Sequence, residues 1–173
     1  MKLAVVVLVM TVVTIAVIFA WGNKKNIKIT SSQNFANIKT EKPLDKYTIE
    51  NLSKIKFGEG EVEFGEVLTD QKDIVSRIFF IKVRGKRVSG LINYPKVSGT
   101  FPVIVMYRGY IDRETYKTGE GTRRSGEVFA KNGFITVAPD FLGYGQSDMP
   151  SESPLEERFQ TYITAATLLV SVK

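Results

Sequence analysis

The residues with the chemistry of a functional site lie in two glycine-containing segments, Arg108-Gly109-Tyr110 and Asp140 to Ser147. An arginine guanidinium has a planar fork of donors that suits carboxylates and phosphates. Arg108 therefore either binds an anionic group of a substrate or pairs with a nearby acid, and the ion pair is the simpler expectation. Both segments directly follow apolar runs, so their positions depend on the strands that precede them.

Ser147 lies in the sequence Gly-Tyr-Gly-Gln-Ser-Asp, which looks at first like a nucleophile elbow. An elbow has the form G-x-S-x-G, but Asp148 follows this serine and no glycine stands two residues further on. Gly143 and Gly145 also lack the third glycine of a dinucleotide-binding fingerprint. We therefore expect Ser147 to be part of a structural turn, neither a nucleophile nor a nucleotide contact.

The composition excludes several kinds of chemistry, because the sequence contains neither histidine nor cysteine. A Ser-His-Asp triad cannot be completed without histidine, which is also the commonest metal ligand. Disulfides, thiolate catalysis, cysteine-ligated zinc and a lipid-attachment cysteine are excluded as well. The acids are scattered and have no calcium-loop spacing. We expect no metal site and no cofactor.

The two segments require buried parallel strands to position them. Val103–Tyr107 and Phe134–Ala138 are short, continuous apolar runs, typical of strands that are covered on both faces. Arg123 to Asn132 between them has a helical pattern, and Gly133 suits the end of that helix. This order predicts a βαβ crossover, followed by a further helix over Pro154–Val172.

The preceding part of the chain predicts antiparallel strands. Ile74–Val83 and Arg87–Tyr94 are rich in β-branched and aromatic residues and flank a turn at Gly85, which indicates a hairpin. Glu61–Thr69 alternates acidic and apolar residues and predicts a third strand, while Leu44–Lys56 predicts a short helix. The fold class is therefore α/β, a mixed sheet with antiparallel leading strands, then a parallel βαβ unit, and helices on both faces.

Residues 1–22 predict a transmembrane signal anchor. The run from Leu3 to Trp21 carries no charged residue, and at about 1.5 Å per residue it spans a hydrocarbon core of ~30 Å. Trp21 stands where an interfacial aromatic residue belongs. A cleaved signal peptide is the alternative, but its apolar region is usually shorter and ends in a small-x-small site that is missing here.

Residues 23–56 predict a polar, basic linker, and residues 57–173 an incomplete globular domain. Lysines outnumber acids six to two between Lys24 and Lys46, and the net charge of the chain is +6. This stretch has no arginine and few aromatic residues, so we expect a membrane tether and no nucleic-acid partner. The lysines alone would favour a cytoplasmic domain. A single N-terminal anchor usually exports the globular domain behind it, and we expect a single-pass membrane protein with an extracytoplasmic domain.

The order of these motifs resembles the α/β-hydrolase superfamily, in particular its dienelactone-hydrolase and prolyl-oligopeptidase-like branch. In that branch one strand ends in His-Gly, a helix ends near Asn-Gly, and the next strand leads into D-x-R-G-x-G-x-S. The matching stretches are Arg108-Gly109-Tyr110, Asn132-Gly133 and Asp140 to Ser147, preceded by Val88-Ser89-Gly90-Leu91. The resemblance covers roughly residues 57–173. It departs from the pattern at Arg108, where the family has histidine, and at Leu142, where it has arginine.

The resemblance implies roles for both segments. The backbone amide of Tyr110 would donate to the oxyanion of a tetrahedral intermediate, and Gly109 would let the backbone approach the substrate. Four further residues would shape a loop near the site, namely Asp140, Gly143, Gly145 and Ser147. In this family the nucleophile follows on the strand after the helix that here spans Pro154–Val172, with the acid and histidine later still.

The resulting expectation is the N-terminal portion of a membrane-anchored serine hydrolase, a peptidase or esterase acting on a small ester or peptide by acyl transfer. This chain lacks the nucleophile, acid and histidine, so we expect it to be inactive alone, as an N-terminal fragment would be. The alternative is a short, non-catalytic, membrane-anchored binding protein with a degenerate hydrolase fold.

Overall fold

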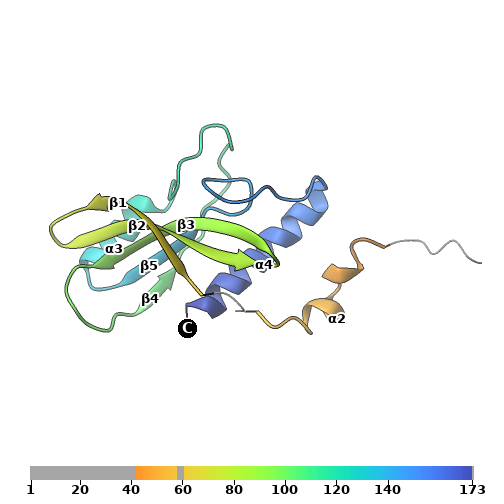
Figure 1. Cartoon of the computed structure of the whole chain (residues 1–173), viewed down its shortest axis with the longest axis horizontal. Coiled ribbons are helices and arrows are strands. Elements are labelled where there is room, and N and C mark those ends of the chain that lie inside the picture. The colour runs from red at the N-terminus through yellow and green to blue at the C-terminus, as the bar shows by residue number, and fades with distance from the viewer. Residues whose placement is uncertain (1–41, 58–60, 173) are drawn as a thin grey trace, which may run out of the picture. The chain divides into compact units, whose positions relative to one another are not determined.

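The computed structural model describes residues 42–57 and 61–172 (Figure 1). The signal anchor predicted at residues 1–22 and the linker up to residue 41 lie outside the described residues. Among the helices of the described part, none combines the length and apolar character that a membrane crossing requires.

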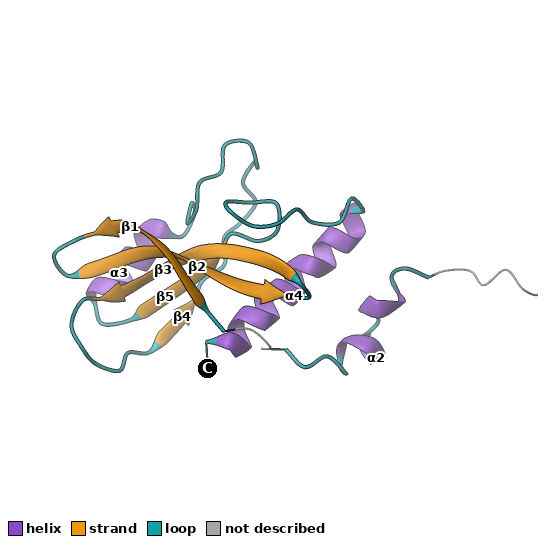
Figure 2. Ribbon diagram, in the orientation of Figure 1, coloured by secondary structure: helices purple, strands orange, loops and turns teal. Residues whose placement is uncertain are grey.

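A five-stranded mixed sheet forms the centre of the described part (Figure 2). Its order is β1-β2-β3-β5-β4. The first four strands in this order pair antiparallel, and β4 pairs parallel to β5, as the sequence predicts. The strands are β1 (Glu63–Asp70), β2 (Ile74–Val83), β3 (Lys86–Pro95), β4 (Val103–Val105) and β5 (Ile135–Pro139).

Strands β2 and β3 form the predicted hairpin, in continuous register from Ile74 opposite Pro95 to Val83 opposite Lys86. The two turn residues both have positive φ, 48° at Arg84 and 80° at Gly85. Such a turn matches the right-handed twist of the flanking strands. The hairpin therefore closes at the place where the sequence puts its glycine.

Strand β4 differs from the prediction in length and burial. It ends at Val105 instead of Tyr107, and Val103 is 40% exposed, because β4 pairs with β5 on one side only among the described strands. Beyond the strand, Tyr107 turns towards helix α4 (Pro154–Ser171) and its hydroxyl donates to the Ala165 carbonyl at 2.9 Å. No residue of β4 is fully buried, so the expectation that this run is buried on both faces is wrong for the described chain.

Helix α3 (Arg123–Lys131) connects β4 to β5 and completes the predicted βαβ unit. Gly126 lets it approach the sheet closely, since a Cβ there would lie 2.7 Å from the Asn93 amide nitrogen. On this face Asn93 accepts from Ser76 at 2.6 Å and donates to Thr136 at 2.9 Å. The polar groups under α3 are therefore paired with one another.

Helix α4 (Pro154–Ser171) covers the opposite face and starts at the predicted proline. Side chains alternate between the two faces of a strand. Ile163 and Leu168 of α4 pack against those side chains of the sheet that point away from α3. This face holds the main apolar core. Its buried members are Tyr47, Phe79, Ile81, Val83, Val88, Ile92, Val137, Leu142, Ile163 and Leu168.

The segment before the sheet forms two short helical pieces where the sequence predicts one. A 3-10 turn, η2 (Asp45–Tyr47), is followed by α2 (Ile49–Leu52), and the break falls at Thr48, whose side chain caps α2. Tyr47 is buried and its ring stacks on Phe159 with 4.8 Å between centroids. Residues 42–56, which the sequence assigns to the linker, thus include an anchor point on α4.

Candidate functional site

Asp140 follows β5 directly and is completely buried. Its carboxylate accepts from the hydroxyls of Ser89 and Tyr116, both at 2.6 Å, and of Thr118 at 3.0 Å. The backbone N–H of Gly119 adds a fourth donor at 3.3 Å. A buried charge needs such partners, so this carboxylate anchors the surrounding loops and offers no free oxygen for acid–base chemistry.

Tyr116 remains a hydrogen-bond donor in this cluster. Burial, and after it the negative charge of Asp140, raises the pKa of the Tyr116 hydroxyl well above its ordinary value. The hydroxyl therefore keeps its proton across the physiological range and continues to hold the carboxylate.

The glycine-rich turn after Asp140 is tied to the sheet. Gly145 has φ of 57°, and a Cβ at this position would overlap the Asp140 carboxylate. The Ser147 hydroxyl accepts from the Ser89 backbone N–H at 2.9 Å. Gly143 also has positive φ and donates its N–H to the Asp148 carbonyl at 2.8 Å. Ser147 thus lies in a turn held by backbone and carboxylate contacts.

Arg108 does not form the expected ion pair, because no acid among the described residues lies within 4.0 Å of its guanidinium. The guanidinium instead donates to two backbone carbonyls, those of Gly109 at 2.9 Å and Asp140 at 3.0 Å. It also lies over the rings of Tyr144 and Tyr116, at 4.0 and 4.6 Å from their centroids. The stacking on two rings replaces the acid that the sequence suggests.

Gly109 and Tyr110 are open to solvent. The Tyr110 side chain is 87% exposed, and its backbone N–H makes no hydrogen bond within residues 42–57 and 61–172. A Cβ at Gly109 would meet no atom within 4 Å. The N–H of the peptide between these two residues is therefore available to a ligand, while its carbonyl accepts from Arg108.

A cavity of about 390 Å³ lies beside this peptide, within the size range of small-molecule sites. Its walls come from the segments that follow β4 and β5 and from the start of α4. Open α/β sheets bind ligands beyond the carboxyl ends of their strands, which is where this cavity lies. It is lined by Arg108, Gly109, Tyr110, Phe141, Leu142, Tyr144, Pro154, Glu157, Arg158 and Thr161.

The structure divides the predicted site residues into two groups. Arg108, Gly109 and Tyr110 line the cavity, while the other four predicted residues form the turn behind it, namely Asp140, Gly143, Gly145 and Ser147. Tyr144 and Arg158 also line the cavity, and the sequence reasoning missed them. Tyr144 stands between the two turn glycines and Arg158 in the second turn of the predicted helix, so both positions could have been found by asking which side chains surround the Arg108 loop.

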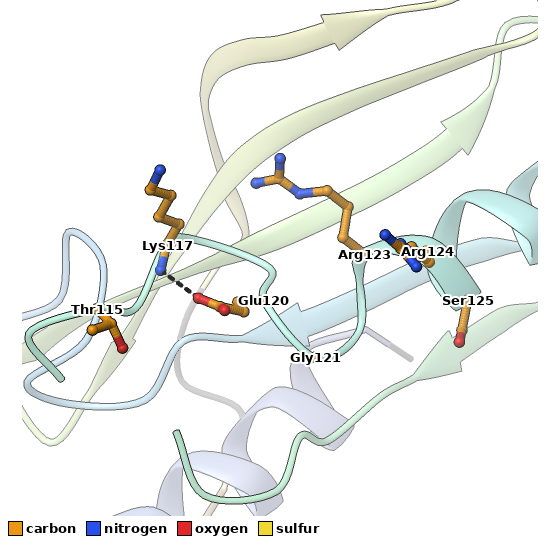
Figure 3. A pocket seen from close by; sticks show the side chains of 7 residues that line it. All are labelled: Thr115, Lys117, Glu120, Gly121, Arg123, Arg124 and Ser125. Carbon is orange, nitrogen blue, oxygen red and sulfur yellow. Dashed lines mark hydrogen bonds between the residues drawn. The ribbon is translucent and has the colours of Figure 1, made fainter. Parts of the chain in front are cut away.

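A larger cavity of about 670 Å³ lies elsewhere, before and along the start of α3 (Figure 3). Lys117, Arg123 and Arg124 make it basic, and Glu120 accepts from the backbone N–H of Lys117 at 3.1 Å. It shares no lining residue with the cavity beside Tyr110. We take the cavity beside Tyr110 as the candidate site, because it lies at the carboxyl ends of the parallel strands β4 and β5 and borders a backbone N–H without a hydrogen-bond partner among the described residues.

The described residues hold no group of three or more carboxylate side chains placed to bind a metal ion. The whole sequence has no histidine. The candidate site therefore contributes backbone donors, cations and aromatic walls, and any proton transfer by an imidazole would need residues outside this sequence.

No protein-family model matches the sequence, and no curated protein does. Among solved structures the chain is similar to acetyl xylan esterase 1 from Thermoanaerobacterium sp. JW/SL YS485. The two share 19% identity and a TM-score of 0.51 over 64% of this chain and 39% of that one. A variant of the rice cell wall degrading esterase LipA from Xanthomonas oryzae shares 19% identity over 63% of this chain and 36% of that one, with a TM-score of 0.35.

The chain thus spans 39% of the length of the acetyl xylan esterase. At this identity the likeness shows the fold alone. The described residues thus share with part of that esterase an α/β fold, here a mixed sheet that contains the parallel β4–α3–β5 unit.

Proposed function

We propose that this chain is the N-terminal portion of a serine hydrolase that cleaves an ester or peptide bond by acyl transfer. The observation that carries the proposal is the Tyr110 N–H, which has no hydrogen-bond partner in the described part of the chain and borders a cavity at the carboxyl ends of β4 and β5. A backbone donor in this loop supplies part of the oxyanion hole in hydrolases of this fold. The motif order supports the narrower dienelactone-hydrolase or prolyl-oligopeptidase-like branch.

In this proposal Tyr110 contributes one oxyanion donor, and residues outside this sequence contribute the nucleophile, acid and histidine. A preorganised donor of this kind lowers the barrier by roughly 2.7–4 kcal/mol. The Asp140 turn contributes by holding the floor of the cavity in place, because Phe141 and Tyr144 on that turn line it.

The outer edge of β4 supports the proposal that further strands complete the sheet. Val103 on this edge is 40% exposed, and Tyr162 and Leu169 of α4 are exposed apolar residues. An unpaired apolar strand edge is a site for pairing with another strand. A following strand at this edge would bring its carboxyl end, and a nucleophile placed there, towards the cavity beside Tyr110.

The membrane anchor and the extracytoplasmic location remain part of the proposal. They rest on the uncharged run at residues 1–22, outside the described part of the chain. A protease-protection assay on membranes that contain the tagged protein would test both.

The test of the enzymatic proposal compares this chain with the longer product read from the coding sequence downstream of Lys173. A fluorophosphonate probe should label the longer product, and that product should hydrolyse p-nitrophenyl acetate or a chromogenic peptide. The 173-residue chain should do neither. Labelling of the short chain at Ser147 would contradict the proposal, and so would a longer product without a reactive serine.

A further inference from the structure

The side chain of Arg108 contacts the peptide unit on which the proposed function depends. Its guanidinium donates to the Gly109 carbonyl oxygen at 2.9 Å. That carbonyl and the Tyr110 N–H belong to the same peptide unit. The described chain contains no cis peptide bond, so the two groups point in opposite directions across a planar, trans bond. Holding the carbonyl therefore sets the direction of the N–H.

Arg108 is itself held in place by the rest of the fold. A second guanidinium nitrogen donates to the Asp140 carbonyl at 3.0 Å, at the end of β5. The rings of Tyr116 and Tyr144 lie on the guanidinium at 4.6 and 4.0 Å, and they meet each other edge to face with centroids 5.1 Å apart. Tyr116 is in turn hydrogen-bonded to the buried Asp140 carboxylate. The arginine thus links the Gly109 carbonyl to the most enclosed part of the site.

The charge of Arg108 also acts on the donor strength of the peptide. A hydrogen bond from an ionised donor is roughly twice as strong as a neutral one. Hydrogen bonds in a chain polarise one another, by perhaps 10–30% per bond. A cation on the carbonyl oxygen therefore makes the N–H of the same peptide a better donor to a developing oxyanion.

We propose that Arg108 is a positioning residue: it orients and polarises the Gly109–Tyr110 peptide so that the Tyr110 N–H serves as the oxyanion donor. The role rests on the proposed function, because it concerns the donor of that same site. It gives a physical account of the position at which this chain departs from the histidine of the hydrolases it resembles. It also assigns a use to a half-buried cation that makes no ion pair with any described residue.

The test measures the motion of the Tyr110 N–H in the full chain by ¹⁵N relaxation. In the wild type its order parameter should be near 0.85, the value of rigid backbone. R108Q loses the positive charge and cannot donate to both carbonyls, so its Tyr110 N–H order parameter should fall below about 0.6. The control is R158Q, which removes an exposed arginine from the wall of the same cavity and should leave the order parameter unchanged.

The wild-type measurement decides the question even if R108Q fails to fold. A Tyr110 N–H with an order parameter below about 0.6 in the wild type overturns the inference. R108K retains the charge and the aliphatic stem but cannot reach both carbonyls with a planar fork, and it should give an intermediate value. Equal values in R108Q and R158Q, with intact hairpin resonances in both, also overturn it.

A second measurement separates this inference from the proposed function. In the longer, active product, R108Q should lower kcat by up to about 10²–10³-fold, the effect of losing one oxyanion donor, with little change in KM. Titration of active serines with the fluorophosphonate corrects for unfolded protein. If the wild-type product has no hydrolase activity, the proposed function fails while the relaxation data still decide the role of Arg108. An unchanged kcat in R108Q refutes the positioning role in an active enzyme.

Discussion

Replacing Asp140 tests whether its carboxylate is the structural anchor of the site. The substitution D140A removes the acceptor of four donors, the hydroxyls of Ser89, Tyr116 and Thr118 and the Gly119 N–H. Tyr116 and Thr118 are partly exposed, so water can replace the lost acceptor there. Ser89 and Gly119 are buried and cannot be rehydrated in the same way, and each keeps only a long alternative acceptor, the Ser147 hydroxyl at 3.2 Å for Ser89 and the Tyr116 hydroxyl at 3.3 Å for Gly119.

The magnitude follows from those two buried donors. Leaving a buried donor unsatisfied costs about 1–3 kcal/mol, so D140A should lower the free energy of unfolding by up to about 2–6 kcal/mol, and by less where the Ser147 and Tyr116 hydroxyls accept instead. A domain of ordinary stability has only about 5–15 kcal/mol in total. D140N should cost less than D140A. Its amide oxygen can keep one pair of donors, and its NH₂ can donate to hydroxyls on the other side that rotate to accept.

Urea denaturation of the full chain, followed by far-ultraviolet circular dichroism and linear extrapolation, measures these differences. E152A is the matched control, because Glu152 is an exposed acid for which no hydrogen bond or ion pair is found among the described residues. It should change the free energy of unfolding by no more than about 0.5 kcal/mol. A loss below about 1 kcal/mol in D140A, or equal losses in D140A and D140N, refutes the anchoring role.

Three further outcomes follow from particular contacts. G145A should destabilise the protein more than G133A in the same denaturation assay: both glycines have positive φ, but an added Cβ meets the Asp140 carboxylate at residue 145 and open space at residue 133. Hydrogen bonding, first from Lys46, lowers the pKa of Glu156 to about 2. Its stabilising contribution should therefore be complete above pH 4.5 and be lost as the pH falls towards 2, and E156Q should remove this part of the pH dependence. Burial, and then the hydrogen bond to Glu156, raises the pKa of Tyr47 to about 12. The free energy of unfolding should therefore fall as the pH rises from 10 to 12, and Y47F should reduce this fall. In the absorbance titration at 295 nm, Y47F should lack one tyrosine that ionises at high pH.

The local sequence predicts most of the fold, because most of its elements carry their own signals. The β2–β3 hairpin follows from β-branched runs around Gly85, and α4 starts at Pro154 with a capping hydroxyl from Ser153. The parallel β4–α3–β5 unit follows from two apolar runs that flank a helical pattern. The early end of β4 carries no local signal, and the contact that Tyr107 makes beyond it, with Ala165 on a helix 58 residues further along the chain, is not visible in the local sequence.

The candidate site was predictable in its backbone and not in its side chains. The sequence places Gly109 and Tyr110 at the carboxyl end of a predicted parallel strand, where open α/β sheets bind ligands, and only the family resemblance assigns the donor role to Tyr110. It cannot show that Tyr116 and Tyr144 meet around Arg108, since those residues come from two separate loops that only the folded sheet brings together.

An arginine next to a glycine suggests an acid partner when only charges are compared. In the fold, two carbonyl oxygens accept from the terminal nitrogens of that guanidinium and two aromatic rings lie against it, while the nearby acid Glu157 pairs with Arg113. Residues from outside the Arg108 loop therefore hold this guanidinium in place, and a substitution at Tyr144 should be judged by its effect on Arg108 as much as by its place on the cavity wall.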